Sequence, residues 1–333
     1  MEIRKLEELE RADTRPLYET VFSEDSRAFV DYYYTEKTKD NQIYTVIEDG
    51  EIRAMLHLNP YSLMVNWVKK NANYIVAVAT QKEYRGRGYM GALLKRALND
   101  MYQEGEAFTF LMPAAEAIYT PYDFRTVYEQ NPLYYQDGEV YPKNVQVAEV
   151  TEADLSELSR AANQDLASKY QVYAFRDEAY YRRLWKECES DGGRLMVYRT
   201  DGHITDCRIA TSEPQGGKRP KIMVRIVDVR RLLMSLSVCS FVGMCFQVTD
   251  PVIEENNRCI LLTGTEYSGV MLMEGSEHQK EGTITIGALT SLIFGVASVE
   301  EIEKEEGVEL SVRLKEELKK LIPLSRIYLN EIV

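Results

Sequence analysis

The first 142 residues alternate between apolar segments and an amphipathic one. Residues 43–47 and 52–58 read as two strands joined at Asp49-Gly50, a dipeptide that favours the positive φ angles of a tight hairpin turn. Residues 74–79 form a continuous apolar run, which predicts a strand buried inside a sheet. Apolar residues then recur every three or four positions from Met90 to Met101, and this spacing predicts a helix with one buried face.

The pattern after this helix predicts the rest of the fold. We expect strands at 108–112 and 124–128, a short helix from Ala114, and a new helical segment opened by a capping box at Thr151 to Asp154. A hairpin at 194–206 turns at Asp201-Gly202, and a glycine- and proline-rich stretch at 213–220 marks a boundary. Beyond it we expect strands at 222–227 and 283–286, and helices at 232–236, 288–296 and 309–321. The sequence therefore predicts an α/β (α+β) protein of three unequal modules: residues 1–142, 143–215 and 216–333.

Composition narrows the classes of function. The chain has 53 acidic and 40 basic residues, a formal charge of -13 that disfavours contact with nucleic acid or anionic lipid. No apolar stretch approaches the roughly 20 residues needed to span a membrane, and the charged N-terminus does not resemble a signal peptide. The five cysteines lack Cys-x-x-Cys spacing. We expect a cytoplasmic protein with reduced thiols, no membrane or nucleic-acid partner and no metal.

One segment carries a chemical signal. An apolar strand ending at Ala79 runs into Arg85-Gly86-Arg87-Gly88, and a helix follows at once. Glycines let backbone N-H groups approach a ligand closely, and the helix N-terminus adds unpaired donors and a positive dipole end, which suits a pyrophosphate. The loop fits neither the Walker nor the dinucleotide-binding pattern. The alternative is an ordinary turn between a strand and a helix.

The loop resembles the signature of the GNAT acyltransferases, Gln/Arg-x-x-Gly-x-Gly/Ala, with Met90 in place of the final small residue. This resemblance implies a GNAT fold that uses acetyl-CoA as co-substrate. The end of the strand would pair with the pantetheine arm and the loop would hold the pyrophosphate. The cofactor-binding residues implied are Val78, Ala79, Thr80, Arg85, Gly86, Arg87, Gly88, Tyr89 and Met90.

A second motif follows about 35 residues later. Residues 119–124, from Tyr119 to Phe124, resemble the family's Tyr-x-x-x-Gly-Phe element, with Asp123 where glycine is usual. In the family this tyrosine is the general acid, and an ordinary tyrosine pKa near 10 keeps the proton available at neutral pH. The alternative is that Tyr119, one of 23 tyrosines, only packs against a sheet edge.

The whole chain resembles the Eis (enhanced intracellular survival) class of acetyltransferases. That class joins a GNAT domain, a degenerate GNAT-like domain, here shortened, and a domain with the sterol carrier protein fold whose last residues return to the active site. The resemblance implies one coenzyme site per chain, a homo-oligomer that would be a hexamer, and the terminal carboxylate of Val333 as catalytic base. The apolar tail at 321–333 should therefore dock on the protein, either near the active site or as a strand of its own domain's sheet.

The acceptor remains open at this stage. The acidic balance suits a primary amine on a cation such as an aminoglycoside, a polyamine or a protein lysine. Asp25 and the run from Asp31 to Tyr34 either line an acceptor pocket or form an ordinary solvated helix face. The histidines His57, His203 and His278 are alternative bases, although His57 lies in a strand pattern typical of a packed residue.

A different class of function competes with the enzyme. The chain could be a non-catalytic acyl-CoA or lipid-binding protein whose carrier-like C-terminal module holds an apolar ligand. Methionines such as Met223 and Met271 could line its pocket, or could be ordinary core residues. The two classes differ at the reactive centre, because a binding protein has no use for Tyr119.

Overall fold

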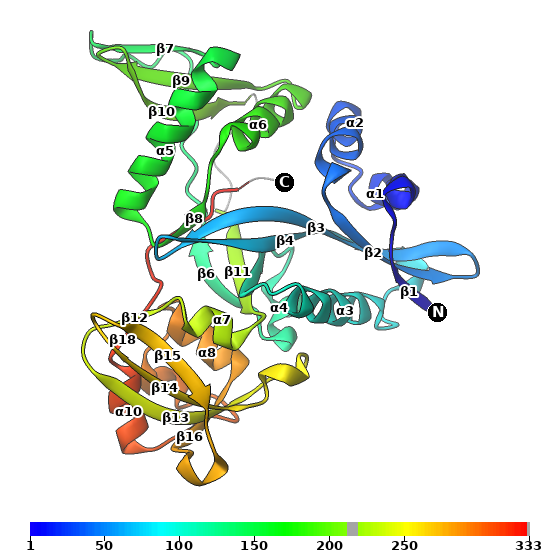
Figure 1. Ribbon diagram of the computed structural model, residues 1–333. Helices are drawn as coiled ribbons and strands as arrows, with labels where there is room; N and C mark the ends of the chain where they lie inside the picture. Colours follow the sequence, from blue (N-terminus) through cyan, green and yellow to red (C-terminus); the bar gives the residue numbers. More distant parts are fainter. Residues whose placement is uncertain (212–218, 332–333) are drawn as a thin grey trace.

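The computed structural model describes residues 1–211 and 219–331, which form three modules (Figure 1). A nine-stranded sheet lies at the centre, a three-stranded sheet with two helices lies on one side, and a five-stranded sheet with helices lies on the other. The mixed α/β class expected from the sequence is confirmed.

The central sheet contains most of the N-terminal module. Its strands run in the order β1-β2-β3-β4-β5-β11-β6, with β8 pairing β3 and β19 pairing β8. The predicted hairpin turn is confirmed, since Asp49 and Gly50 have φ angles of 55° and 75°. The strands of the main path are β1 (Glu2–Lys5), β2 (Gln42–Glu48), β3 (Glu51–Val65), β4 (Val68–Thr80), β5 (Phe108–Leu111), β11 (Lys221–Ile226) and β6 (Arg125–Glu129).

Helices cover the two faces of this sheet differently. Because side chains alternate along a strand, Leu56 and Leu58 of β3 pack with helix α3 (Tyr89–Gln103), whereas Met55 packs with α1 (Arg15–Val21) and α2 (Arg27–Thr35). The short helix α4 (Glu116–Tyr119) follows β5 and belongs to the α3 side. The sheet therefore separates an α3 face from an α1/α2 face.

The middle module is a small antiparallel unit. Strands β7 (Val145–Glu149), β9 (Arg194–Thr200) and β10 (His203–Ala210) pack with helices α5 (Leu155–Lys169) and α6 (Glu178–Ser190). The predicted capping box at Thr151 and Asp154 and the turn at Asp201-Gly202 are confirmed. Between its helices, β8 (Val172–Ala174) leaves the module and pairs with the tip of β3.

The C-terminal module is built on a sheet that the sequence reading had largely missed. The sequence pattern does not indicate strands β13 to β15, and the helix expected at 309–321 spans only Val312–Leu318. The strands are β12 (Ser237–Val238), β13 (Val242–Thr249), β14 (Cys259–Thr265), β15 (Gly269–Glu274), β16 (Gly282–Thr285), β17 (Glu309–Leu310) and β18 (Leu321–Ile322). The helices are α7 (Val229–Leu233), α8 (Ile286–Ile293), α9 (Val299–Ile302) and α10 (Val312–Leu318).

The strand expected at 222–227 does not belong to the C-terminal module. It forms β11, which lies between β5 and β6 and pairs with both, so the expected boundary at residue 216 is wrong for this strand. The middle module is therefore inserted between two neighbouring strands of the central sheet.

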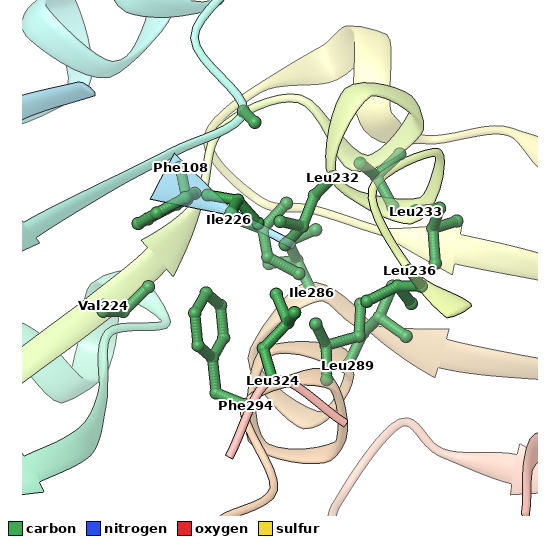
Figure 2. Close-up of a cluster of buried hydrophobic side chains, with 14 of the residues drawn as sticks. Phe108, Val224, Ile226, Leu232, Leu233, Leu236, Ile286, Leu289, Phe294 and Leu324 are labelled. Atoms are coloured by element: carbon green, nitrogen blue, oxygen red, sulfur yellow. The ribbon is translucent and has the colours of Figure 1, made fainter. Parts of the chain in front are cut away.

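A shared core joins the central sheet to the C-terminal module. Figure 2 shows Phe108 of β5 and Ile226 of β11 in contact with a cluster from α7, α8 and the chain end. These side chains are fully buried or nearly so, and the same cluster includes Leu289, Phe294 and Leu324. Because these apolar side chains are buried between the two parts, the C-terminal module packs tightly against the central sheet.

Candidate functional site

Strand β4 has a bulge beside residues 78–80, where the GNAT resemblance implies contact with the pantetheine arm. Its pairing with β3 shifts between His57-Val76 and Met55-Ala79, so that two residues of β4, Ala77 and Val78, oppose one of β3. Ala77 has a φ angle of 48°, a left-handed conformation that is costly for alanine. A bulge of this kind leaves a backbone group outside the ladder and redirects the strand.

Strands β4 and β5 separate beside this bulge. Their parallel pairing covers only Tyr74-Phe110 and Ile75-Leu111, after which β4 continues alone on this side to Thr80. Ala77, Val78 and Thr80 are partly exposed, whereas Ala79 is buried. β4 therefore has a free edge on this side from Val76 to Thr80, here called the slot, and an extended ligand could pair with it.

The glycine loop lies at the end of β4 as predicted. Gly86 and Gly88 have φ angles of 76° and 82°, and Gly88 is the residue that caps the N-terminus of α3. Residues from Arg85 to Gly88 are exposed, so the first N-H groups of a 15-residue helix face an open surface. This geometry is that of an anion-binding turn.

Basic side chains surround the loop. Arg85 donates from Nε to the carbonyl of Thr80 at 3.2 Å, and Arg53 and Arg87 stack on the ring of Tyr84, each 4.5 Å from its centroid. A cavity of about 970 Å³ beside the loop is bordered by Arg53 and Arg85. Tyr89 is buried and its hydroxyl donates to Glu48, so its side chain supports the loop from within.

Met90 departs from the family pattern without closing the turn. The small residue of the motif is found one position later, at Gly91. A Cβ at Gly91 would overlap the hydroxyl of Tyr122, so this position requires glycine. Glycine at 91 therefore allows the Tyr119–Phe124 turn to approach α3 closely. Gly91 is visible in the sequence, but only the structure shows that Tyr122 is the residue packed against it.

Tyr119 ends helix α4 on the α3 face. Its side chain is 7% exposed and its ring lies 5.9 Å from that of Phe124. Burial raises the pKa of Tyr119 to about 12. Within the described residues its hydroxyl has no hydrogen-bond partner, so the proton is both retained and available.

The turn after Tyr119 explains the aspartate in the motif. Asp123 adopts a left-handed φ of 64°, a conformation that aspartate tolerates better than most residues other than glycine. The turn is closed by backbone bonds from Asp123 to Thr120 at 3.0 Å and from Phe124 to Tyr119 at 3.4 Å. The substitution therefore preserves the turn.

A second group of ionisable residues lies on the α1/α2 face. The ring of Tyr61 lies 6.1 Å from that of Tyr74 and 5.9 Å from that of Phe110, a pair one position before β4 and β5 separate. Tyr61 borders a cavity of about 200 Å³, and the carboxylates of Glu187 and Glu331 face the same space. The cavity thus opens next to the slot, on the side opposite Tyr119.

Glu187 and Glu331 each form an ion pair with a basic side chain. Buried Glu187 pairs with Lys37 at 2.8 Å and accepts the hydroxyl of Tyr32 at 3.1 Å. Glu331 pairs with Arg176 at 3.3 Å and accepts from Tyr180. Of these residues the sequence pointed only to Tyr32, within the run from Asp31 to Tyr34. Lys37, Glu187 and Glu331 come from three modules, and no local pattern indicates that they meet.

The chain end docks beside the central sheet. β19 (Ile327–Tyr328) pairs with β8, and Gln130 donates to the carbonyls of Leu329 and Glu331 at 3.1 and 3.0 Å. The expectation that the tail docks is confirmed, and the alternative of a last strand in its own module's sheet is wrong for β19. The carboxylate of Val333 lies outside the described residues.

The acidic and aromatic run near the N-terminus divides into two parts. Tyr32 and Tyr33 lie on the buried side of α2, in a cluster with Met55 and Ala79, whereas Asp31 is exposed and pairs with Arg15 at 2.5 Å. Asp25 accepts the hydroxyl of Tyr18 at 2.8 Å and borders a cavity of about 570 Å³ that Glu187 also lines. The run is therefore neither a single pocket nor a single solvated face.

His57 is a packed histidine, as the strand pattern indicated. It is 0% exposed, its Nδ1 lies 3.0 Å from the hydroxyl of Tyr33, and its buried Nε2 has no partner among the described residues. No group of three metal-ligating side chains was found in the described part of the chain. No helix among the residues described is long and apolar enough to span a membrane.

Burial lowers the pKa of His57 to about 3, which gives the protein an acid-sensitive site. The folded state then binds fewer protons than the unfolded state below pH 6.5, so the free energy of unfolding falls as the pH is lowered. We expect wild type to lose about 2 kcal/mol from this group between pH 7 and pH 5, a loss that His57→Gln lacks. Urea unfolding at both pH values measures the difference. His203→Gln, whose side chain is 86% exposed, should keep the wild-type dependence, and an unchanged slope in His57→Gln would contradict the prediction.

Comparison with known families agrees with this geometry. Residues 2–127 match the model of the acetyltransferase (GNAT) domain, and residues 235–330 match that of the sterol carrier protein domain. The chain therefore carries a GNAT acetyltransferase domain followed, after the middle module, by a sterol carrier protein-like domain. No curated protein matches the chain.

Solved structures share the complete architecture. A probable N-acyltransferase of unknown function from Enterococcus faecalis is 15% identical, with a TM-score of 0.74 over 97% of this chain and 98% of that one. A GCN5-related N-acetyltransferase from Anabaena variabilis is 13% identical, with a TM-score of 0.72 over 99% and 97%. Eis1 from Mycobacterium abscessus is 13% identical, with a TM-score of 0.69 over 96% and 97%. These likenesses confirm the fold expected from the sequence.

Proposed function

We propose that the protein is an Eis-type N-acetyltransferase that moves an acetyl group from acetyl-CoA to a primary amine. Three features together support this most strongly: the bulge of β4, the glycine loop at its end, and buried Tyr119, which shares a core cluster with Val78 of β4. An anion-binding turn alone would serve many ligands. The tyrosine adds the proton that a departing thiolate requires.

The coenzyme would use the α3 face. The first N-H groups of α3 and the basic side chains around residues 85–90 fit a pyrophosphate, and the free edge of β4 at residues 78–80 fits an amide-bearing arm. These residues are the ones that the GNAT resemblance implied. The exposure of residues 85–88 and the positive φ angles of Gly86 and Gly88 support the assignment.

The proposed reaction forms one C-N bond and breaks one C-S bond. The lone pair of a neutral amine attacks the thioester carbonyl carbon, and a backbone N-H near Val78 stabilises the carbonyl oxygen. The intermediate then expels the thiolate, Tyr119 donates its proton to the sulfur, and the amine gives up a proton to a base. Tyr119 recovers its proton from solvent, so the products are the acetamide and the free thiol of coenzyme A.

The amine would enter from the α1/α2 face. Two cavities lie there, and Glu187 borders both, together with Asp25 in the larger and Glu331 in the smaller. Carboxylates at the entrance favour a cationic acceptor, such as an aminoglycoside, a polyamine or a protein lysine. A homo-oligomer, hexameric by the Eis resemblance, remains a prediction.

An assay of thiol release tests the proposal. Acetyl-CoA is mixed with the protein and with each of a panel of aminoglycosides, polyamines and lysine peptides, and both free thiol and acetylated amine are quantified. We expect amine-dependent release with one acetamide formed per thiol. Binding of acetyl-CoA without release for any amine would favour the second candidate, a non-catalytic acyl-CoA-binding protein.

The terminal carboxylate of Val333 is proposed as the base. The docked tail supports this, since Gln130 and Arg176 hold residues 329–331 beside the cavity that Tyr61 borders. We expect an extension of four residues after Val333 to lower kcat at least ~10²-fold, because it replaces the carboxylate with a peptide bond. The same extension before Met1 is the control. Normal turnover in the C-terminally extended protein would assign the base to another group.

A further inference from the structure

An arginine in the middle of an apolar strand forms a fully buried ion pair. Arg225 and Asp250 both have side chains that are 0% exposed, and Nη2 of Arg225 lies 2.6 Å from Oδ1 of Asp250. Arg225 belongs to β11 of the central sheet, whereas Asp250 follows β13 of the C-terminal module. The pair therefore joins the two modules inside the protein.

Asp250 is fixed by its own module. Its Oδ1 accepts the backbone N-H groups of Val252 and Ile253 at 2.8 and 3.0 Å, and its Oδ2 accepts from Asn256 at 2.9 Å. Asn256 in turn donates to the carbonyl of Val227, just after β11. A carboxylate bound by this many donors has a single orientation, and it can orient a guanidinium in turn.

Arg225 uses its remaining donors on the central sheet. Nε donates to the carbonyl of Tyr122 at 2.8 Å, and Nη1 donates to the carbonyl of Ile226 at 2.7 Å. Tyr122 lies in the turn that begins at Tyr119 and closes at Phe124. Arg225 therefore links Asp250 to the backbone of the turn that contains Tyr119, the proposed general acid.

The C-terminal module contacts the same turn at a second point. A Cβ at Gly287, in the first turn of α8, would lie 2.6 Å from Oδ1 of Asp123, so that α8 packs directly on this residue. Beyond the turn, Arg125 of β6 forms a partly exposed ion pair with Glu305 of the C-terminal module at 3.1 Å. The turn is therefore held from the α3 side by Gly91 and from the other side by the C-terminal module.

We propose that Arg225 is a positioning residue for Tyr119, and that the C-terminal module contributes to acyl transfer through Asp250 and Arg225. The ion pair fixes the Tyr122 carbonyl and with it the direction in which Tyr119 leaves the turn. This inference rests on the proposed function, because it assigns Tyr119 the transfer of a proton. The C-terminal module would then help to position Tyr119, a role that does not require a lipid ligand.

A double-mutant cycle tests the proposal. We expect Arg225→Lys and Asp250→Asn, which retain polar groups of similar size, to lower kcat 10- to 100-fold with KM for acetyl-CoA changed less than twofold. In a Tyr119→Phe background the same substitutions should change kcat less than twofold, because the group that they position is already absent. If the fold-losses in kcat of the single variants multiply in the double variants, the substitutions act independently of Tyr119 and the proposal is overturned.

Two controls separate positioning from loss of stability. Leu289→Ala removes buried contacts between α8 and the central sheet without touching the Tyr122 carbonyl, and should lower Tm while kcat at 20 °C stays within threefold of wild type. Glu305→Gln removes the partly exposed pair at the same interface and should be nearly neutral. If Leu289→Ala loses as much kcat as Asp250→Asn at a similar Tm, the ion pair has only a structural role.

A readout without turnover keeps this proposal distinct from the proposed function. 3-Fluorotyrosine at position 119 gives a ¹⁹F resonance that reports its surroundings in the complete protein. Arg225→Lys and Asp250→Asn should shift or broaden this resonance, whereas Glu305→Gln should not. If the resonance is unchanged in Arg225→Lys and Asp250→Asn, the positioning role is overturned, whether or not any amine is acetylated. If the resonance shifts in these two variants but the wild-type protein acetylates no amine, only the proposed acetyltransferase activity is contradicted.

Discussion

Gly88→Glu is expected to abolish binding of coenzyme A, with a loss in affinity of at least ~10²-fold. Gly88 caps α3 with a φ of 82°, and no atom lies within 4 Å of the position that a Cβ would take, so the side chain would extend into the open space above the loop. A glutamate there places a negative charge where the helix N-terminus and its N-H groups favour an anion. Titration calorimetry with coenzyme A measures the effect.

Backbone strain needs its own control, because any residue other than glycine is costly at this φ. Gly202→Glu provides it, since Gly202 has a φ of 84°, also lies in open space, and belongs to the hairpin turn of the middle module. We expect this variant to bind coenzyme A normally and to lose similar stability. A folded Gly88→Glu protein with unchanged affinity would remove the loop from the site.

Tyr119→Phe is expected to lower kcat by ~10² to 10⁴-fold while the affinity for acetyl-CoA and the Tm change little. The ring and its packing against Phe124 are retained, and only the proton is lost. Because burial raises the pKa of Tyr119 to about 12, wild-type activity should show no decline from its ionisation below pH 10. Steady-state thiol release as a function of pH measures both effects.

Another tyrosine of the same core serves as control. Tyr44 is buried beside α3 and its hydroxyl donates to Asp100 at 3.0 Å, so Tyr44→Phe removes a hydroxyl without touching the slot. Its kcat should stay within twofold of wild type. Normal turnover in Tyr119→Phe would transfer the role of acid to Tyr122, Tyr128 or water.

The fold was predictable where local pattern and chemistry agree. The Asp-Gly hairpins, the capping box at Thr151 and helix α3 depend on nearby residues, and each was expected within a few positions. The position of β11 was not predictable from periodicity, because an apolar strand does not specify its neighbours. Arg225 in the middle of this strand was a visible signal that a buried charge had a partner, yet the sequence could not identify Asp250.

The candidate site divides in the same way. Gly88 and Tyr119 lie in short motifs, and a motif places its own residues. The residues on the opposite face come from all three modules: Tyr61 from β3, Glu187 from α6 and Glu331 from the chain end. Only the folded chain brings them together. The left-handed φ of Ala77 was also hidden, since alanine in a strand carries no sign of a bulge.

A structure of the protein in complex with coenzyme A would test the central claim most directly, through the position of the sulfur atom. The account predicts the pyrophosphate against the backbone of residues 85–90, the pantetheine arm along β4 from Val78 to Thr80, and the sulfur within hydrogen-bond distance of Oη of Tyr119. A coenzyme bound in the cavity of about 510 Å³ in the C-terminal module, between Leu292 and Leu318, would contradict it. A sulfur atom beyond the reach of Tyr119 would contradict it equally.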